Sequence, residues 1–135
     1  MAPTTPDDLK QVPLFAELDS RQLRRLAKHF RARTVPAGTV VVREGEMSGA
    51  GFFVVADGEA VVNVGGNDVK TVGPGEHFGE LALVSEGKRS ATITARTELQ
   101  LYEIPFWDFR EFAHANPDVT WKLLQHVVGL VQPPA

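Results

Sequence analysis

Residues 52–64 have the sequence FFVVADGEAVVNV, and this stretch decides the fold class. Two runs rich in Val and Phe, Phe52–Ala56 and Ala60–Val64, lie on either side of a turn at Gly58, which predicts two short β-strands. Runs of the same kind recur between Arg33 and Pro105, separated by glycine turns; they are Thr39–Arg43, Val69–Val72, Ala91–Arg96 and Leu99–Ile104. Many short strands with frequent turns predict a sandwich, a jelly roll or a small barrel.

The chain before these strands predicts one helix. From Leu18 to Phe30 the apolar residues are spaced as on one helix face; they are Leu23, Leu26, Ala27 and Phe30. Asp19 or Ser20 can cap its start. The preceding segment, residues 1–10, is polar and contains two prolines, so we expect it to be an irregular lead-in.

Two helices are predicted after the strands. Pro105 begins the first, and Asn116 caps the second, with Pro117 at its first position. On a wheel of about 100° per residue, the apolar residues of the last helix cover an arc of roughly 200°, about twice what one buried face needs. One side of this arc holds Val119, Leu123, Val127 and Leu130, and the other holds Trp121, Leu124 and Val128. We therefore expect one side to meet the barrel and the other to meet a ligand or a second copy of the chain, as a homodimer.

Length and composition limit the function classes. The chain has 135 residues, which predicts a single domain over residues 1–135 with its core at about 14–130. Its 14 basic and 17 acidic residues argue against direct nucleic-acid binding, and no apolar run is long enough to predict a membrane span. The chain has no cysteine, which fits a cytoplasmic location. His77 has no histidine partner at metal-ligand spacing, so we expect no metal.

One segment does not fit a strand. Helix-forming residues follow Gly79, namely Glu80, Leu81, Ala82, Leu83 and Val84. A helical turn inside a β-barrel would present backbone N–H groups and its positive dipole end to an anion. Arg89 follows shortly after and offers a planar fork that can take two phosphate oxygens. The alternative is that Glu80 and Arg89 form only a salt bridge across a turn.

The order and spacing of several motifs resemble the cyclic nucleotide-binding domain family, which includes protein kinase A regulatory subunits, the catabolite activator protein and cyclic-nucleotide-gated channels. The motifs are Pro36-Ala37-Gly38, Arg43-Glu44-Gly45-Glu46, residues 53–59, Gly73-Pro74-Gly75, residues 78–83 and Arg89-Ser90-Ala91-Thr92. The resemblance extends from about Leu14 to Leu130. It implies an α+β fold: a double-stranded β-helix (jelly-roll) barrel with an N-terminal helix, an internal short phosphate-binding helix and two C-terminal helices.

The resemblance also implies the roles of individual residues. Arg89, with Ser90 and the backbone of Ala82, would hold the cyclic phosphate. Glu80 would accept a hydrogen bond from the ribose 2′-hydroxyl, flanked by Gly79 and Leu81.

For the residues that would contact the base, the sequence leaves two interpretations open. Family position places Val62 and Val72 beside the base, although both also fit plain barrel core. Trp121 is a candidate lid that stacks on the base; the alternative is packing on the barrel or on Phe112. In this family a serine at the position of Ser90 occurs in cAMP-selective sites as well as in cGMP-selective ones. We favour cAMP over cGMP as the ligand.

These features predict a regulatory sensor and not an enzyme. Ligand would draw in the phosphate-binding segment, Leu83 or Leu81 would shift, and the C-terminal helices would move. The output would pass to an unknown effector protein or to an output domain missing from this chain. The competing hypothesis is an interaction module of the same fold that binds no nucleotide, and an enzyme ranks third.

Overall fold

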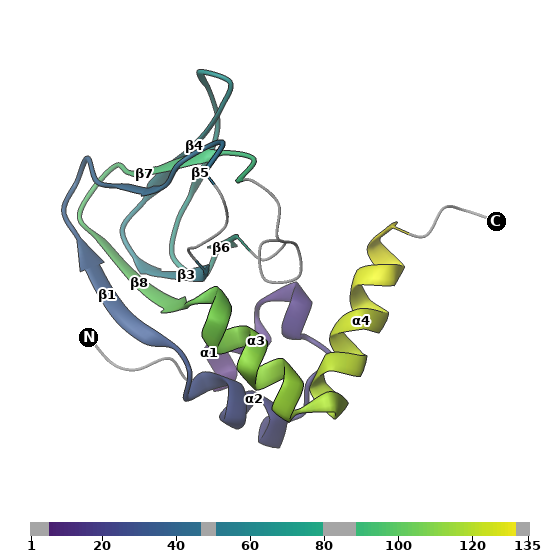
Figure 1. The fold of residues 1–135 in the computed structure, drawn as a ribbon. Helices are drawn as coiled ribbons and strands as arrows, with labels where there is room; N and C mark the ends of the chain where they lie inside the picture. The colour runs from purple at the N-terminus through teal and green to yellow at the C-terminus, as the bar shows by residue number, and fades with distance from the viewer. Residues whose placement is uncertain (1–5, 47–50, 80–88, 132–135) are drawn as a thin grey trace.

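The computed structural model describes residues 6–46, 51–79 and 89–131 (Figure 1). Within these ranges the chain forms two antiparallel sheets with a group of helices at one end. The arrangement is an α+β jelly-roll barrel, as predicted.

Each sheet has four strands, and neighbours in a sheet are often distant in sequence. In the first sheet the order is β1 (Arg31–Val35), β8 (Leu99–Ile104), β3 (Phe52–Asp57) and β6 (His77–Phe78). In the second it is β2 (Val40–Val42), β7 (Thr92–Ala95), β4 (Ala60–Val64) and β5 (Asn67–Val72). This order places the residues that follow β6 next to the residues that precede β3.

The strands β3 and β8 form a wall that is buried on both faces. On β3, Phe52 and Val54 face the helices, while Phe53 and Val55 face the barrel interior. The two sets belong to two separate clusters of buried side chains, here called the helical core and the barrel core. Successive side chains of a strand point to opposite faces, so one strand contributes to both cores.

The structure corrects the expectation that the first ten residues are an irregular lead-in. Residues Pro6–Lys10 form the helix α1, and Pro13–Phe15 form the 3₁₀ helix η1. Leu9 and Val12 are fully buried in the helical core. Packing against the rest of the protein, and not local periodicity, therefore holds this segment.

The predicted first helix is α2 (Ser20–Ala27), shorter than the periodic segment. Asp19 caps it: its carboxylate accepts a hydrogen bond from the backbone N–H of Gln22, whose side chain accepts one from the backbone N–H of Asp19. This reciprocal pair is a capping box.

The predicted C-terminal helices are α3 (Phe106–Ala115) and α4 (Pro117–Val131). The two sides of α4 differ as expected. Val119 and Leu123 are buried in the helical core, with Val127 packed against it. On the other side Trp121 is 61% exposed, Leu124 52% and Val128 49%. We call Trp121, Leu124 and Val128 the outer stripe of α4; in this structure it is left open to solvent.

Candidate anion-binding site

The site lies where the end of β6 meets the start of β3. Phe78, the last residue of β6, pairs with Phe53. Gly79 follows Phe78 and Gly51 precedes β3, so the two glycines lie close together. The guanidinium of Arg89 reaches the same point, where its Nη2 donates a hydrogen bond of 2.8 Å to the carbonyl oxygen of Gly51.

The backbone of Arg89 is held in place by a turn of the barrel. Its N–H donates to the carbonyl oxygen of Glu46 at 2.8 Å, and its carbonyl oxygen accepts from the N–H of Gly45 at 2.9 Å. Arg89 is therefore fixed at its backbone by one loop and at its side chain by another.

Two glycines allow these groups to approach. Gly79 has φ +87°, a left-handed conformation that side chains rarely adopt, and a Cβ there would lie 3.0 Å from Arg89 Nη1 and 2.8 Å from the Gly51 oxygen. A Cβ on Gly51 would lie 1.7 Å from the carbonyl oxygen of Ile104, the last residue of β8. The site can accept no side chain at either position without moving backbone.

The charge of Arg89 is buried, and the described residues supply its guanidinium with one hydrogen-bond acceptor, the carbonyl oxygen of Gly51. Its side chain is 8% exposed, and burial lowers the pKa of its guanidinium, which nevertheless stays protonated. Its Nε is buried without a hydrogen-bond partner, and none of the Asp and Glu side chains that the structure describes forms an ion pair with it. Burying a charged group costs several kcal/mol. Charge-assisted hydrogen bonds to a bound anion could recover an amount of this order.

The other predicted site residues come from several different elements. Ser90 is exposed next to Arg89. Val62 and Val72 are buried at 7% and 0% exposure in the barrel core. Trp121 lies on the outer stripe of α4, outside both cores. Glu80, Leu81, Ala82 and the predicted internal helix lie outside the described residues.

Sequence reasoning missed the role of Gly51. It is followed directly by β3 and was indistinguishable from the other turn glycines, because its functional atom is a backbone carbonyl. Within the described parts of the chain, no three His, Asp or Glu side chains are grouped to hold an ion. Likewise, no helix in those parts is long and apolar enough to cross a membrane.

Comparison with known proteins identifies the family of the chain. Residues 32–116 match the family model of the cyclic nucleotide-binding domain. A cyclic nucleotide-gated potassium channel of Mesorhizobium japonicum is 41% identical over 108 residues, which are 80% of this chain and 30% of the channel. A cAMP-dependent protein kinase regulatory subunit of Schizosaccharomyces pombe is 40% identical over 94 residues, 69% of this chain and 23% of that subunit.

Solved structures show the same fold. The N-terminal domain of a transcriptional regulator from Streptomyces coelicolor A3(2) superposes with a TM-score of 0.85 at 32% identity, covering 93% of each chain. The fold is that of a regulatory jelly-roll domain, and the chain belongs to the cyclic nucleotide-binding domain family. It spans about a quarter to a third of the length of the two curated relatives above.

Proposed function

We propose that this chain binds a 3′,5′-cyclic nucleotide, with cAMP preferred to cGMP, and reports the binding through its C-terminal helices. The observation that carries the proposal is the environment of Arg89. Its guanidinium is buried, its Nε has no hydrogen-bond partner, and within the described residues its Nη2 donates to the backbone carbonyl of Gly51. The name of the Schizosaccharomyces pombe relative supports cAMP as the ligand.

In this proposal one segment of the chain, residues 79–90, binds both the phosphate and the ribose. Arg89 holds the cyclic phosphate, helped by the hydroxyl of Ser90 and the backbone of Ala82. Glu80 accepts a hydrogen bond from the ribose 2′-hydroxyl. The absence of a side chain at Gly79 keeps the approach to the guanidinium open, and Leu81 completes the ribose side.

The base is proposed to rest against the barrel. Val62 and Val72, which are both buried in the barrel core, would supply its apolar side from β4 and β5. Trp121 is proposed as the lid. Trp121 is 61% exposed in this structure, and in this proposal α4 moves toward the barrel so that the indole covers the base.

The signal in this proposal is a movement of the C-terminal helices, which arises because the ligand binds two arrangements of the protein with different affinity. Ligand draws in the segment after Gly79, Leu81 or Leu83 shifts, and the C-terminal helices move. The ligand can shift this equilibrium only by its difference in affinity for the two arrangements. The output passes to an effector protein or to another domain, and neither catalysis nor a metal is part of the mechanism. A cytoplasmic location stays a prediction from the absence of cysteine.

A second copy of the chain is the proposed occupant of the outer stripe of α4, as an alternative to the base. Trp121, Leu124 and Val128 are all about half exposed or more. Their spacing of three and four residues is the spacing of a two-helix seam.

Calorimetric titration tests the nucleotide proposal directly. Wild-type protein is titrated with cAMP, cGMP and 5′-AMP, and we expect the tightest binding for cAMP. Arg89→Ala should abolish binding or weaken it at least about tenfold, because a charge-assisted contact is typically worth 1.5–3 kcal/mol. Arg96→Ala, which removes an exposed arginine from the same barrel, is the matched control and should bind as wild type does.

The competing function, an interaction module of the same fold, makes the opposite prediction. It would show no binding and no thermal stabilisation. A true ligand at 100 times its dissociation constant should add about 2.7 kcal/mol to the free energy of unfolding. Recovery of unchanged cAMP after long incubation separates a sensor from an enzyme.

A further inference from the structure

The hairpin formed by β4 and β5 ends in a turn of two glycines. Val64 pairs with Asn67 across the hairpin, and between them Gly65 has φ +60° and Gly66 φ +89°. Two successive residues with positive φ form the type I′ turn, which joins two strands through a loop of two residues. The strand ladder offers no acceptor to the backbone N–H groups of the two glycines, so a side chain or water must bind them.

Two side chains bind these N–H groups. The N–H of Gly66 donates to Asn63 Oδ1 at 3.1 Å, a contact inside the hairpin. The N–H of Gly65 donates to Glu44 Oε1 at 2.9 Å. Glu44 lies 21 positions earlier in the chain, after the end of β2. Its carboxylate therefore connects the tip of the hairpin to a different part of the barrel.

Glu44 belongs to the turn that holds the backbone of Arg89. The next two residues of this turn, Gly45 and Glu46, form backbone hydrogen bonds of 2.9 Å and 2.8 Å with Arg89. The backbone N–H of Glu44 donates to Thr92 Oγ1 at 2.9 Å, at the start of β7. The turn is thus bound to Arg89 through its backbone and to the hairpin through the side chain of Glu44.

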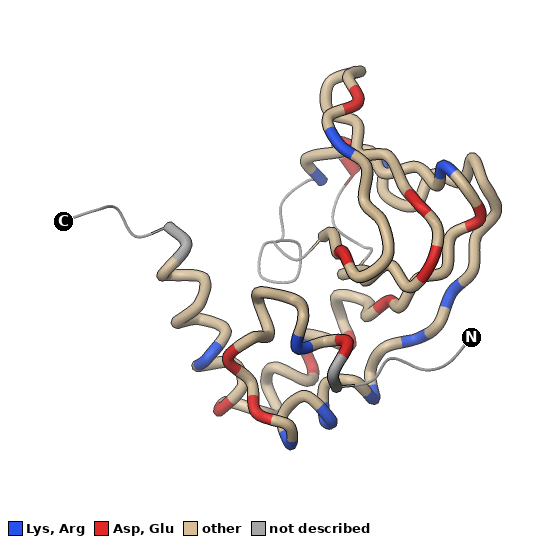
Figure 2. The backbone as a smooth tube through the Cα atoms, turned by 180° about the vertical axis from the view of Figure 1, so that it is seen from behind, with Lys and Arg blue, Asp and Glu red and all other residues tan. Residues whose placement is uncertain are grey.

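Only the tip of the hairpin depends on this side chain for its position. Val62 and Asn63 of β4 pair with Ile93 and Thr92 of β7, so strand pairing fixes this part of the hairpin. The tip beyond it projects from the barrel in both views (Figure 1 and Figure 2). Segments whose hydrogen bonds are exposed open locally at little cost in free energy. Loss of the bond to Glu44 would therefore leave the ladders of β4 intact and free the tip.

We propose that Glu44 is a positioning residue, which holds the β4–β5 hairpin in place relative to Arg89 and thereby raises the affinity for the base of the nucleotide. This inference rests on the proposed function, in which Arg89 holds the phosphate while Val62 and Val72 of the hairpin contact the base. A site that is ordered before the ligand arrives loses less free energy on binding. A ligand without a base does not use the hairpin, so it gains nothing from the contact of Glu44.

Calorimetry with two ligands tests this role. The first ligand is cAMP, and the second is ribose 3′,5′-cyclic phosphate, which lacks the base and is measured by displacement of bound cAMP. Glu44→Ala should weaken the binding of cAMP about fivefold, because one exposed hydrogen bond to a charged group is lost. It should leave the binding of the base-free ligand unchanged. A loss of the same size for both ligands overturns the proposal, and so does no loss for either.

Two further variants provide a rescue and a control. Glu44→Gln keeps an oxygen that can accept from the N–H of Gly65, so it should bind cAMP within about twofold of wild type. Glu98→Ala removes an exposed glutamate from the turn before β8, and it should bind both ligands as wild type does. A Glu44→Gln variant that binds cAMP as weakly as Glu44→Ala overturns the proposal.

Solvent exchange of single amides, measured by NMR without ligand, tests the contact itself. The Gly65 amide should exchange faster in Glu44→Ala than in wild type or Glu44→Gln, while the Gly66 amide, bound by Asn63, keeps its rate. Equal Gly65 rates in wild type and Glu44→Ala overturn the proposal.

The failure of this inference can be told from the failure of the proposed function. If wild-type protein binds no cAMP, both fail. If wild-type protein binds cAMP and Glu44→Ala binds it equally well, only the positioning role of Glu44 fails.

Discussion

At the scale of single residues, the space around Arg89 controls the site. The guanidinium and the Gly51 carbonyl leave no room for a side chain at Gly79. Gly79→Ala should therefore displace the guanidinium and weaken cAMP binding, measured by calorimetry, by tenfold or more. The left-handed backbone itself costs roughly 1–2 kcal/mol of stability with alanine.

Gly38→Ala is the control for this prediction. Gly38 has φ +90°, close to that of Gly79, but nothing lies within 4 Å of the Cβ it would gain. Both variants should lose the stability that the left-handed backbone costs, and Gly79→Ala should lose more because its Cβ meets the Gly51 oxygen. Only Gly79→Ala should lose affinity. Equal affinities would show that the guanidinium does not have to lie where the structure places it.

A second residue-scale prediction concerns Glu80. If its carboxylate accepts the ribose 2′-hydroxyl hydrogen, wild-type protein should bind 2′-deoxy-cAMP several-fold more weakly than cAMP, because a hydrogen bond to a charged group is worth about 1.5–3 kcal/mol. Glu80→Gln should weaken binding of cAMP but add little to the loss with 2′-deoxy-cAMP. Equal wild-type affinities for the two ligands would remove Glu80 from the ribose role.

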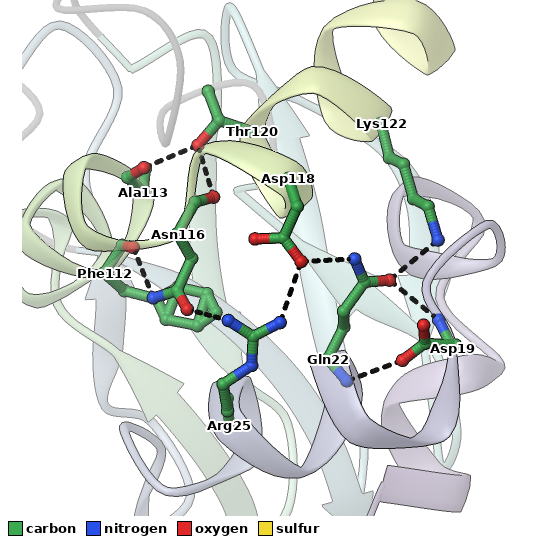
Figure 3. Close-up of polar contacts among 9 residues, drawn as sticks. All are labelled: Asp19, Gln22, Arg25, Phe112, Ala113, Asn116, Asp118, Thr120 and Lys122. Atoms are coloured by element: carbon green, nitrogen blue, oxygen red, sulfur yellow. Dashed lines mark hydrogen bonds and ion pairs between the residues drawn. The ribbon is translucent and has the colours of Figure 1, made fainter.

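At the scale of elements, the contact between α2 and the start of α4 makes stability depend on pH (Figure 3). Gln22 Nε2 donates to Asp118 Oδ2 at 2.7 Å, and Arg25 Nη2 donates to the same oxygen at 2.9 Å. Hydrogen bonds from Gln22 and then Arg25 lower the pKa of Asp118 to about 2. Because the pKa is lower in the folded state than the unfolded value of about 3.9, this stabilisation is present above about pH 4 and is lost as pH falls toward 2. Urea unfolding of wild type and Asp118→Asn should show a stability difference that shrinks over this window. A difference that stays constant would mean that the charge of Asp118 contributes nothing to the contact.

The outer stripe of α4 gives another element-scale prediction. If a second copy covers it, the wild-type protein should be a dimer by analytical ultracentrifugation, and Leu124→Glu should be a monomer that still binds cAMP. Gln125→Glu, an exposed neighbour outside the stripe, should leave the dimer intact. A monomeric wild type would contradict the dimer and leave Trp121 to act within one chain.

The elements that sequence predicts are those with a local apolar pattern. Ala60–Val64 and Leu99–Ile104 begin and end as predicted, and the two sides of α4 separate as its arc indicates. The strand β1 was missed because residues 31–34 are all exposed at a sheet edge, held to β8 by pairing and by the Arg33–Glu103 ion pair. The hydrogen bonds between α2 and α4 were missed because their partners meet only after folding.

In the candidate site, too, the sequence predicts some of the groups and misses others. Arg89 was predicted from a charged side chain in a recognisable spacing, and the structure adds its burial. The Gly51 carbonyl could not be predicted, since a backbone acceptor leaves no mark on residue type. The ligand-binding role of Arg89 stays a prediction, as do those of Glu80, Leu81 and Ala82.

At the scale of the whole molecule, the two cores share the wall formed by β3 and β8. Tyr102 and Ile104 face the helices, while Leu99 and Leu101 face the barrel. A shift on one face of a close-packed wall is felt on the other, because protein interiors leave few voids to absorb it. Gly51 adds a direct contact, since its backbone lies against Ile104 at the end of β8, just before α3. Ligand and helices can thus communicate through packed backbone.

The shared wall predicts that helices and barrel unfold together. Val119→Ala, in the helical core, should lower the free energy of unfolding by about 2 kcal/mol, and Ile93→Val, in the barrel core, by about 1 kcal/mol. In each variant, urea unfolding followed by fluorescence of Trp107 and Trp121 on the helices should coincide with unfolding followed by the amide signals of β4 and β7. If Val119→Ala instead melts the helices while the barrel amides keep their wild-type midpoint, the two cores are independent. The wall would then not couple ligand to helices.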